Sequence, residues 1–201
     1  MDDFSVAAKE QTICAETIAN IGKHLQVPLN NLGLIKKFNG VNILQTRWFI
    51  KVSCEDYITR ILTDRNWLTL KAANLHVPMR SDPTYQCQLE AATRPKDEKE
   101  QHLIQQQAGF FYMMAIGELI YALVAARPEI SYATTKLTQY GSSPALIHYQ
   151  AVKHVYSFLN NTKEDGLIFL APDTSDGSSG CSFSNSMVLC TRYSPHTQDG
   201  A

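Results

Sequence analysis

The apolar positions in the first part of the chain predict a strand followed by a helix. Residues 3–8 form a short run that is typical of a strand, and residues 10–25 carry apolar side chains at helical spacing with alanines between them. Pro28 marks the end of this amphipathic helix. The expected apolar stripe consists of Ile13, Ile18, Ile21 and Leu25.

The next apolar segments predict a β-meander. Segments 34–38 and 41–45 flank Asn39-Gly40, a dipeptide that favours a tight hairpin turn, and segment 48–52 follows after a short break. Ser53 is then expected to cap a further helix. The apolar positions of that helix are Tyr57, Ile58, Ile61 and Leu62.

Residues 109–126 are almost wholly apolar, with Glu118 as the one charged residue. A membrane span and a buried helix are the two alternatives. The stretch is barely long enough to span a bilayer, and a carboxylate costs about 2.5 kcal/mol or more at the bilayer centre. The pattern therefore favours a buried helix.

Two more helices are predicted after this stretch. Pro128 is placed for a first helical turn, and Gly141 is placed to end that helix. Ser143-Pro144 repeats the start signal for a helix whose apolar stripe reaches Phe158. A short strand is expected at 167–170, after three consecutive antiparallel helices.

The remaining segments complete an α+β organisation. Residues 66–108 contain three spaced prolines and a charge run, which is typical of a connector, although 97–107 has the pattern to open a helix. The expected parts are 1–65 (strand, helix, β-meander, helix), the connector 66–108, the helical subdomain 109–170 and a flexible tail 171–201.

Composition adds few constraints to this picture. The chain has 201 residues, 44% hydrophobic and 18% charged, with a net charge of −1, which is ordinary for one or two globular domains. Its five cysteines include no C-x-x-C pair, so neither a disulfide framework nor a zinc site is indicated. The acidic N-terminus lacks the pattern of a signal peptide, so we expect the chain not to be secreted.

Positive charge is concentrated in residues 33–65, which carry six basic and three acidic residues. Aromatic residues are interleaved with them, the mixture that proteins use to follow a phosphate backbone and to stack on bases. A solvated hairpin face with core aromatics is the alternative interpretation. The basic residues are Lys36, Lys37, Arg47, Lys51, Arg60 and Arg65.

Four blocks of the helical stretch resemble a known family. In order they read IGELIY at 116–121, ARPEISYA at 126–133, HYQAVKH at 148–154 and LNNTKEDGL at 159–167. Their order and spacing resemble the reverse transcriptase of copia-type retrotransposons, downstream of its catalytic palm. FNGV at 38–41 then resembles the strands after the catalytic hairpin.

The resemblance gives a meaning to the first residues, Met1-Asp2-Asp3-Phe4. The family carries Tyr-x-Asp-Asp at its polymerase hairpin, so the chain is expected to begin inside this motif. The resemblance implies that Asp2 and Asp3 are catalytic carboxylates and ligands of Mg²⁺, which prefers rigidly held oxygen ligands. It also implies a C-terminal palm over 1–65 and a thumb and connection over 109–170.

The departures from the family pattern limit what we expect of this chain. The motif tyrosine, the fingers and the earlier palm aspartate are missing, so we expect an RNA-directed DNA polymerase fragment that is inactive alone. A non-catalytic module that binds nucleic acid or protein is the alternative, and a decayed element without function is a third. No ribonuclease H activity is assigned to the last thirty residues.

The resemblance also implies partners. Lys36, Lys37, Arg47 and Lys51 look like the primer-grip side of the palm, where they would meet an RNA/DNA template-primer. Exposed strand edges predict self-association or pairing with a missing polymerase half, and no membrane partner is expected. The expected location is cytoplasmic or nuclear. Arg127 is expected to have a structural role. His148 and His154 are six positions apart, which is not the spacing of helical metal ligands, so they are expected to be packing or surface residues.

Overall fold

Packing divides the chain into two units. The computed structural model describes residues 3–8, 11–26, 29–46, 48–70, 75–170 and 186–192. We call the described parts of residues 1–52 and 168–201 the sheet unit, and the described parts of residues 53–167 the helical unit. The sequence places a boundary near residue 65, whereas the structure places it before the helix at 55–64.

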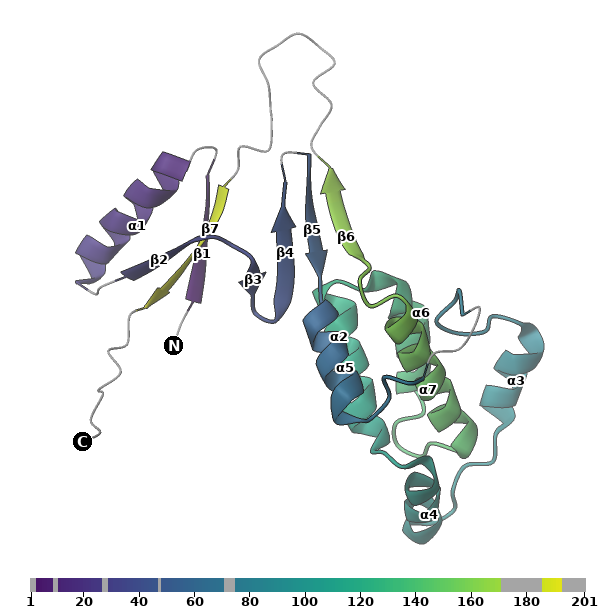
Figure 1. Ribbon diagram of the computed structural model, residues 1–201. Helices are drawn as coiled ribbons and strands as arrows, with labels where there is room; N and C mark the ends of the chain where they lie inside the picture. Colours follow the sequence, from purple (N-terminus) through teal and green to yellow (C-terminus); the bar gives the residue numbers. More distant parts are fainter. Residues whose placement is uncertain are drawn as a thin grey trace. The chain divides into compact units, whose positions relative to one another are not determined.

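The first sheet of the sheet unit has three strands in the order β1-β7-β2. β1 (Asp3–Ala8) and β2 (Leu29–Leu34) both pair antiparallel with β7 (Ser186–Arg192), so the central strand comes from the far end of the chain (Figure 1). This strand differs from the flexible tail that the sequence predicts for 171–201. The Ser- and Gly-rich run at 173–180 lies outside the described residues.

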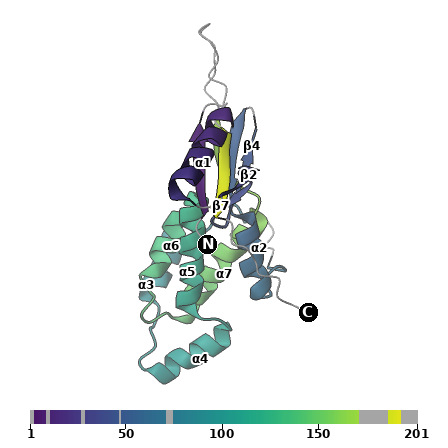
Figure 2. The same ribbon diagram turned by 90° about the vertical axis from the view of Figure 1, so that its left-hand side faces the viewer.

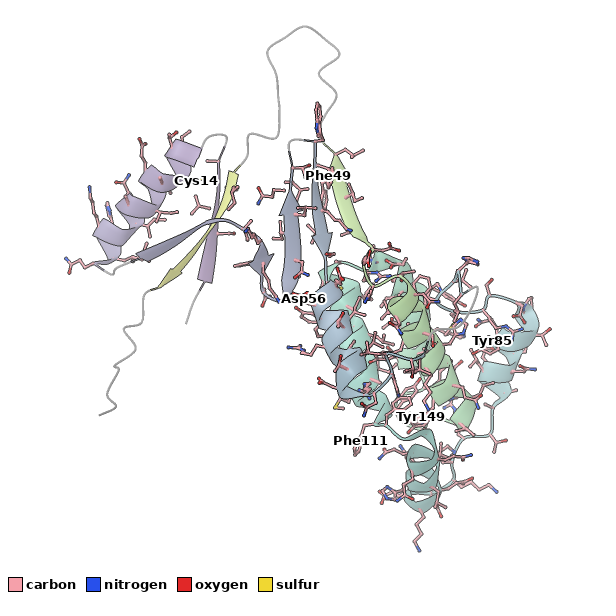
Figure 3. The ribbon with its side chains drawn as sticks, in the orientation of Figure 1. Cys14, Phe49, Asp56, Tyr85, Phe111 and Tyr149 are labelled. Atoms are coloured by element: carbon pink, nitrogen blue, oxygen red, sulfur yellow. The ribbon has the colours of Figure 1, made fainter. Side chains whose placement is uncertain are left out.

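The helix α1 (Gln11–Leu25) covers a small core. Cys14 and Ile18 are buried, with Val6, Ala8 and Leu29 packed against them, and Figure 3 marks Cys14 on the helix. The predicted apolar stripe is therefore partly wrong, because Ile13 and Leu25 at its ends are exposed. Cys14 acts as a small hydrophobic residue and shifts the buried line of the helix by one position.

The second sheet has the order β3-β4-β5-β6. Its strands are β3 (Lys37–Phe38), β4 (Val41–Gln45), β5 (Phe49–Ser53) and β6 (Gly166–Leu170). Asn39 and Gly40 have φ of 49° and 80°, which closes β3 and β4 into the two-residue hairpin that their sequence predicts. The meander begins later than predicted, because Leu34 ends β2.

The helical unit is built around α7 (Leu146–Asn161), as Figures 1 and 2 show. α7 contacts α2 (Glu55–Asp64), α4 (Glu98–Ala108), α5 (Tyr112–Ala125) and α6 (Ser131–Thr138). A short 3₁₀ turn, η1 (Pro128–Ile130), joins α5 to α6 at the predicted proline. Most of α7 is buried, as expected of a central helix.

The connector contains two helices that pack onto this unit. Asp82 caps α3 (Pro83–Ala91) by accepting a hydrogen bond from the Tyr85 N–H at 2.9 Å, and Pro83 occupies the first helical position. Asp97 caps α4 in the same way, and Gly109 ends it with φ of 82°. The apolar pattern of the connector does not predict α3, although Asp82-Pro83 is a start signal for a helix.

The helix α2 begins one residue later than predicted. Ser53 is the last residue of β5, and Cys54 takes the N-cap position without a side-chain hydrogen bond. Ile58, Ile61 and Leu62 are buried as predicted. These three side chains make α2 part of the helical unit.

A line of aromatic rings fills the core of the helical unit. Trp67 makes edge-to-face contacts with Phe110 and Tyr156, and Tyr149 makes them with Phe110 and Tyr112, at centroid distances of 5.0 and 5.1 Å. Such pairs contribute about 0.5–1.5 kcal/mol each beyond the area they bury. They join α5 and α7 to the start of the connector.

The apolar helix α5 has a buried face and an outward face. Tyr112, Ala115, Ile116, Leu119 and Ala122 are buried, as the sequence predicts for a core helix. Among the described residues no single helix has the length and hydropathy of a membrane span, and only the bent pair α4 and α5 together meets that criterion.

Candidate nucleic-acid interface

The predicted lysines lie on the second sheet and beside it. Lys36 precedes β3, Lys37 is on β3 and Lys51 is on β5; the first two are exposed and Lys51 is half-buried. Arg47 lies outside the described residues. The structure therefore describes three of the four residues that are predicted to contact nucleic acid.

The strand register brings Lys37 and Lys51 to one face. Lys37 stands opposite Asn42 of β4, and the Thr46 N–H donates to the Phe49 carbonyl at 2.9 Å to join β4 to β5. In an antiparallel pair, two residues before Thr46 on β4 lie opposite two residues after Phe49 on β5, so Leu44 is opposite Lys51. Leu44 is two residues from Asn42 and therefore lies on the same face. Lys37, exposed Leu44 and Lys51 thus follow one another across three neighbouring strands.

An exposed aromatic side chain lies at the end of this face. Trp48, in the turn between β4 and β5, is 69% exposed, and its N–H donates to the Thr46 hydroxyl. Phe38 and Phe49 are half-buried. We call Lys37, Leu44 and Lys51, with Trp48 at their end, the lysine face. Lys36 is opposite Ile43, whose N–H donates to the Lys36 carbonyl at 2.8 Å, and therefore lies on the other face of the sheet.

Other members of the basic segment belong to the helical unit. Arg65 is largely buried against Glu118, and Arg60 stacks over the Tyr57 ring on α2. The basic stretch 33–65 is therefore divided between the two units, with a sheet face in one and a set of helix contacts in the other. Its sequence spacing does not reveal this division, because the break falls at the buried Ser53 and Cys54.

The predicted catalytic carboxylates are only partly described. Asp2 lies outside the described residues. Asp3 is the first residue of β1, where it stands opposite Thr191 of β7, and its side chain lies outside the described set. Within the described part of the chain, no group of three or more Asp, Glu, His or Cys residues is arranged to hold a metal ion.

The helical unit contains a buried ion pair that the sequence pattern does not predict. The Arg65 guanidinium donates two hydrogen bonds to the Glu118 carboxylate, each 2.9 Å, and the two side chains are only 9% and 21% exposed. The Tyr156 hydroxyl donates to the same carboxylate and lies near the Ala115 carbonyl. The lone acid in an apolar helix was the available signal, because a buried charge requires a partner.

Tyr57 completes this cluster from α2. Its hydroxyl donates to the Glu118 carbonyl at 3.3 Å, and its ring lies 4.3 Å from that of Tyr121. Burial, and then the negative charge of Glu118, raise the pKa of Tyr57 to about 12. Burial and the hydrogen bond to Glu118 also raise the pKa of Tyr156. Both phenol groups therefore stay neutral at physiological pH and can donate their hydrogen bonds to Glu118, which joins α2, α5 and α7.

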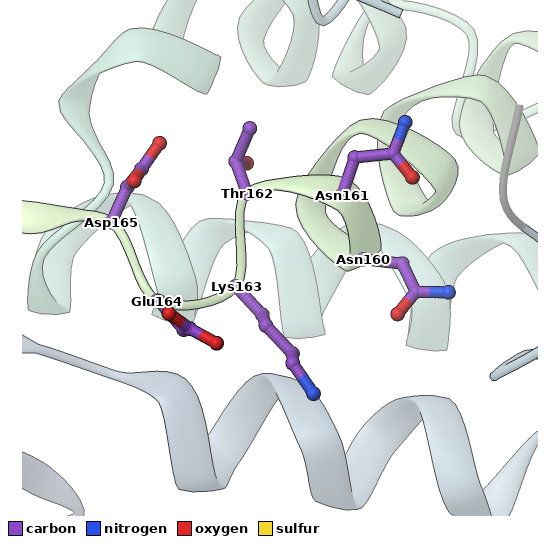
Figure 4. Close-up of a pocket in the computed structure, with 6 residues that line it drawn as sticks. All are labelled: Asn160, Asn161, Thr162, Lys163, Glu164 and Asp165. Atoms are coloured by element: carbon purple, nitrogen blue, oxygen red, sulfur yellow. The ribbon is translucent and has the colours of Figure 1, made fainter. Parts of the chain in front are cut away.

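A second buried arginine closes the end of α7. Arg127, which is 1% exposed, donates from its two terminal nitrogens to the carbonyl and hydroxyl of Thr162 and from Nε to Glu129. It takes the structural role expected from its place before Pro128. The loop that it anchors surrounds a polar hollow of about 330 Å³ (Figure 4). The hollow is lined by Asn160, Asn161, Thr162, Lys163, Glu164 and Asp165.

The two histidines of α7 differ in burial. His148 Nδ1 accepts from the Ala145 N–H at 2.9 Å, so Nε2 carries the proton and donates to the Leu89 carbonyl. Its ring stacks on Tyr140 at 3.9 Å, and burial lowers its pKa. His154 is half-buried, and its Nε2 lies 3.3 Å from the Val77 carbonyl. Both rings therefore pack against the protein.

The chain is similar to retrotransposon polyproteins over most of its length. The retrovirus-related Pol polyprotein of transposon TNT 1-94 from Nicotiana tabacum is 26% identical over 175 residues, 86% of this chain and 12% of that polyprotein. The corresponding polyprotein of transposon RE1 from Arabidopsis thaliana is 25% identical over 174 residues, 87% of this chain and 11% of that polyprotein. The chain thus spans about a tenth of these relatives.

A shorter similarity involves a different kind of protein. The secreted RxLR effector protein 161 of Plasmopara viticola is 36% identical over 63 residues, 31% of this chain and 44% of that protein. No family model and no solved structure matches the chain. The long similarities support a retrotransposon origin, with this chain corresponding to a segment of a Pol polyprotein.

Proposed function

We propose that this chain derives from the C-terminal palm and thumb of a copia-type reverse transcriptase and that its sheet unit binds a template-primer duplex. The observation that carries the proposal is the lysine face, read together with the similarity to Pol polyproteins over more than four fifths of the chain. The four sequence blocks of the helical unit support the same origin.

The lysine face has the chemistry of a nucleic-acid contact. Ammonium groups from β3 and β5 neutralise phosphates and release counterions, which gives affinity without sequence preference. The exposed Trp48 ring offers a stacking platform beside them. Because the net charge of the chain is −1, binding depends on this local arrangement rather than on the charge of the whole molecule.

Polymerase chemistry is not part of the proposal for this chain alone. The resemblance assigns Mg²⁺ to Asp2 and Asp3, but two adjacent carboxylates form only part of a two-metal site. Among the described residues no group of three or more His, Cys, Asp or Glu is placed to hold a metal ion. We therefore propose template-primer binding for this chain and assign it no extension.

The test is binding to a poly(rA)/oligo(dT) duplex at several salt concentrations. We expect the logarithm of the binding constant to fall linearly with the logarithm of the salt concentration. The double variant Lys37→Ala/Lys51→Ala should weaken binding at least about tenfold and lower the steepness of that line by about two. The matched control is Lys96→Ala/Lys99→Ala, which removes the same charge from an exposed part of the helical unit. An equal loss of affinity in both double variants would refute the proposal that the lysine face binds the duplex.

A primer-extension assay with Mg²⁺ runs on the same samples. No extension is the expected result. Extension by the wild-type chain that disappears in Asp2→Asn would contradict the claim that the site is incomplete. Absence of any salt-sensitive binding would contradict the proposed function itself and would favour a folded relic.

A further inference from the structure

The outward face of α5 carries a continuous apolar stripe. Met113, Gly117, Ile120 and Val124 follow one another at spacings of four, three and four residues. Met113, Ile120 and Val124 are 58%, 42% and 79% exposed, and Gly117 is exposed as well. This spacing is that of the a and d positions where one helix packs along another. No charged residue interrupts the stripe.

Gly117 has no local reason to be glycine. It stands in the middle of a helix, where glycine is among the least favourable residues, and its φ is not in the left-handed region. A Cβ built at this position would meet no atom within 4 Å in the described protein. Glycine on a helix surface permits the close approach of another backbone. The position therefore points to a helix that docks from outside.

A shallow hollow of about 360 Å³ lies beside the stripe, between α5 and α6. Its lining consists of Ile120, Leu123, Thr134, Thr135, Thr138 and Gln139. Thr134 is buried, and its hydroxyl has no hydrogen-bond partner among the described residues. The stripe thus has a recess next to it that can receive side chains from a docked helix.

We propose that two copies of this chain associate through α5, with the two helices antiparallel about a two-fold axis midway along the stripe. In that arrangement Gly117 faces the partner's Ile120, and Met113 faces the partner's Val124. The space above Gly117 is thus filled by the branched side chain of the partner's Ile120. The stripe is therefore complementary to itself, as a two-fold interface requires. The absence of charge on the stripe means that like charges do not meet across the axis.

The area of the face suits a weak dimer. Phe111, the N-cap of α5, and Met114, which follows Met113, are also exposed beside the N-terminal end of the stripe. With these two flanking residues, the exposed apolar side chains amount to on the order of 500 Å² per copy. Two such faces approach the lower limit of specific interfaces, about 1,200 Å² in total. We therefore expect a dissociation constant in the micromolar range.

The first experiment is sedimentation equilibrium of the full chain without nucleic acid, from about 1 to 100 μM. The wild type should show a monomer–dimer equilibrium, and Val124→Glu should raise the dissociation constant at least about tenfold, because each copy then buries a charge. The matched control is Leu103→Glu, an equally drastic change at an exposed position of α4, which should leave the equilibrium unchanged. A wild type that stays monomeric, or equal effects of both changes, would overturn the proposal.

A size-swap tests the pairing itself. Gly117→Ile alone should weaken the dimer, because it meets the partner's Ile120. Gly117→Ile/Ile120→Gly should restore association, because the large and small residues exchange places across the axis. Circular dichroism checks that each variant keeps its helices. A double variant that keeps its helices but stays monomeric would contradict this pairing, whatever the outcome of the nucleic-acid experiments.

Discussion

In the helical unit, the side chains of Leu62, Leu119 and Val152 are wholly buried, whereas Leu44 and Phe169 of the second sheet stay exposed. The buried core described in the sheet unit is small, with Cys14, Ile18 and Ile35 as its members below a tenth exposed. Apolar burial is the main favourable term in folding. The helical unit therefore has a core that supports itself, and the sheet unit depends more on what covers it.

The two units also treat charge differently. In the helical unit Arg65 and Arg127 are buried and hydrogen-bonded to carboxylates, carbonyls and hydroxyls. In the sheet unit Lys36 and Lys37 are exposed. Buried, paired charges hold helices in place, whereas exposed lysines are accessible to phosphates. This contrast is why we assign the binding surface to the sheet unit and scaffolding to the helical unit.

The largest expected effect comes from truncating matched leucines. Leu119→Ala removes a wholly buried side chain of α5 and should destabilise the protein by about 3–5 kcal/mol, because it leaves a cavity. Leu44→Ala changes an exposed position of β4 and should cost less than about 0.5 kcal/mol. Urea unfolding followed by the helical circular dichroism signal measures both. An equal loss in the free energy of unfolding for the two variants would contradict the proposed difference in core burial between the two units.

The buried ion pair should give the next largest effect. Glu118→Gln leaves the Arg65 charge without its partner and should cost about 3 kcal/mol. Glu90→Gln breaks the exposed pair with Lys136 on the same unit and should cost no more than about 1 kcal/mol. The same urea titration compares them. A cost for Glu118→Gln as small as that for Glu90→Gln would mean that the cluster does not clamp α2 to α5.

Acid should destabilise the helical unit through His148. Its folded-state pKa lies below the ordinary value of 6.5, because burial disfavours the charged ring. The folded state therefore favours the neutral ring. The contribution of His148 to the free energy of unfolding is fully present above about pH 6.5 and is lost as the pH falls below that value. For one proton, the free energy of unfolding falls by no more than about 1.4 kcal/mol per pH unit.

The control for this prediction is the other histidine. His154 also has a pKa lowered by burial, so both His148→Gln and His154→Gln are compared with the wild type at pH 7.5 and 5.5. Because His148 is wholly buried and His154 is only half-buried, we expect the pH dependence of the urea midpoint to shrink more in His148→Gln. Equal slopes in the wild type and in His148→Gln would show that its protonation is not linked to folding.

The smallest expected effect comes from two glycines that differ in backbone conformation. Gly117→Ala should stabilise the chain by about 0.5–1 kcal/mol, because the helix gains a better residue and the added Cβ meets nothing. Gly109→Ala should destabilise it by about 1 kcal/mol, because φ of 82° is unfavourable for alanine. Thermal melts at low protein concentration separate these changes from any effect on association.

Local signals account for the parts of the fold that the sequence predicted. Asn39-Gly40 closes its hairpin because both residues tolerate positive φ, and Gly109 ends α4 for the same reason. The apolar run at 109–126 formed a buried helix because its buried positions recur at helical spacing. Each of these outcomes depends on residues within a few positions of one another, so the amino-acid sequence determined them.

Tertiary packing decided the rest. Arg65 meets Glu118 across 53 positions, and β7 enters between β1 and β2 from the far end of the chain. Within α1, contact with the sheet selected Cys14 rather than Ile13 as the buried residue. Partners so distant are chosen by the burial and pairing of whole elements, which no local pattern encodes. The separation of one basic segment into a lysine face and a buried helix clamp has this same origin.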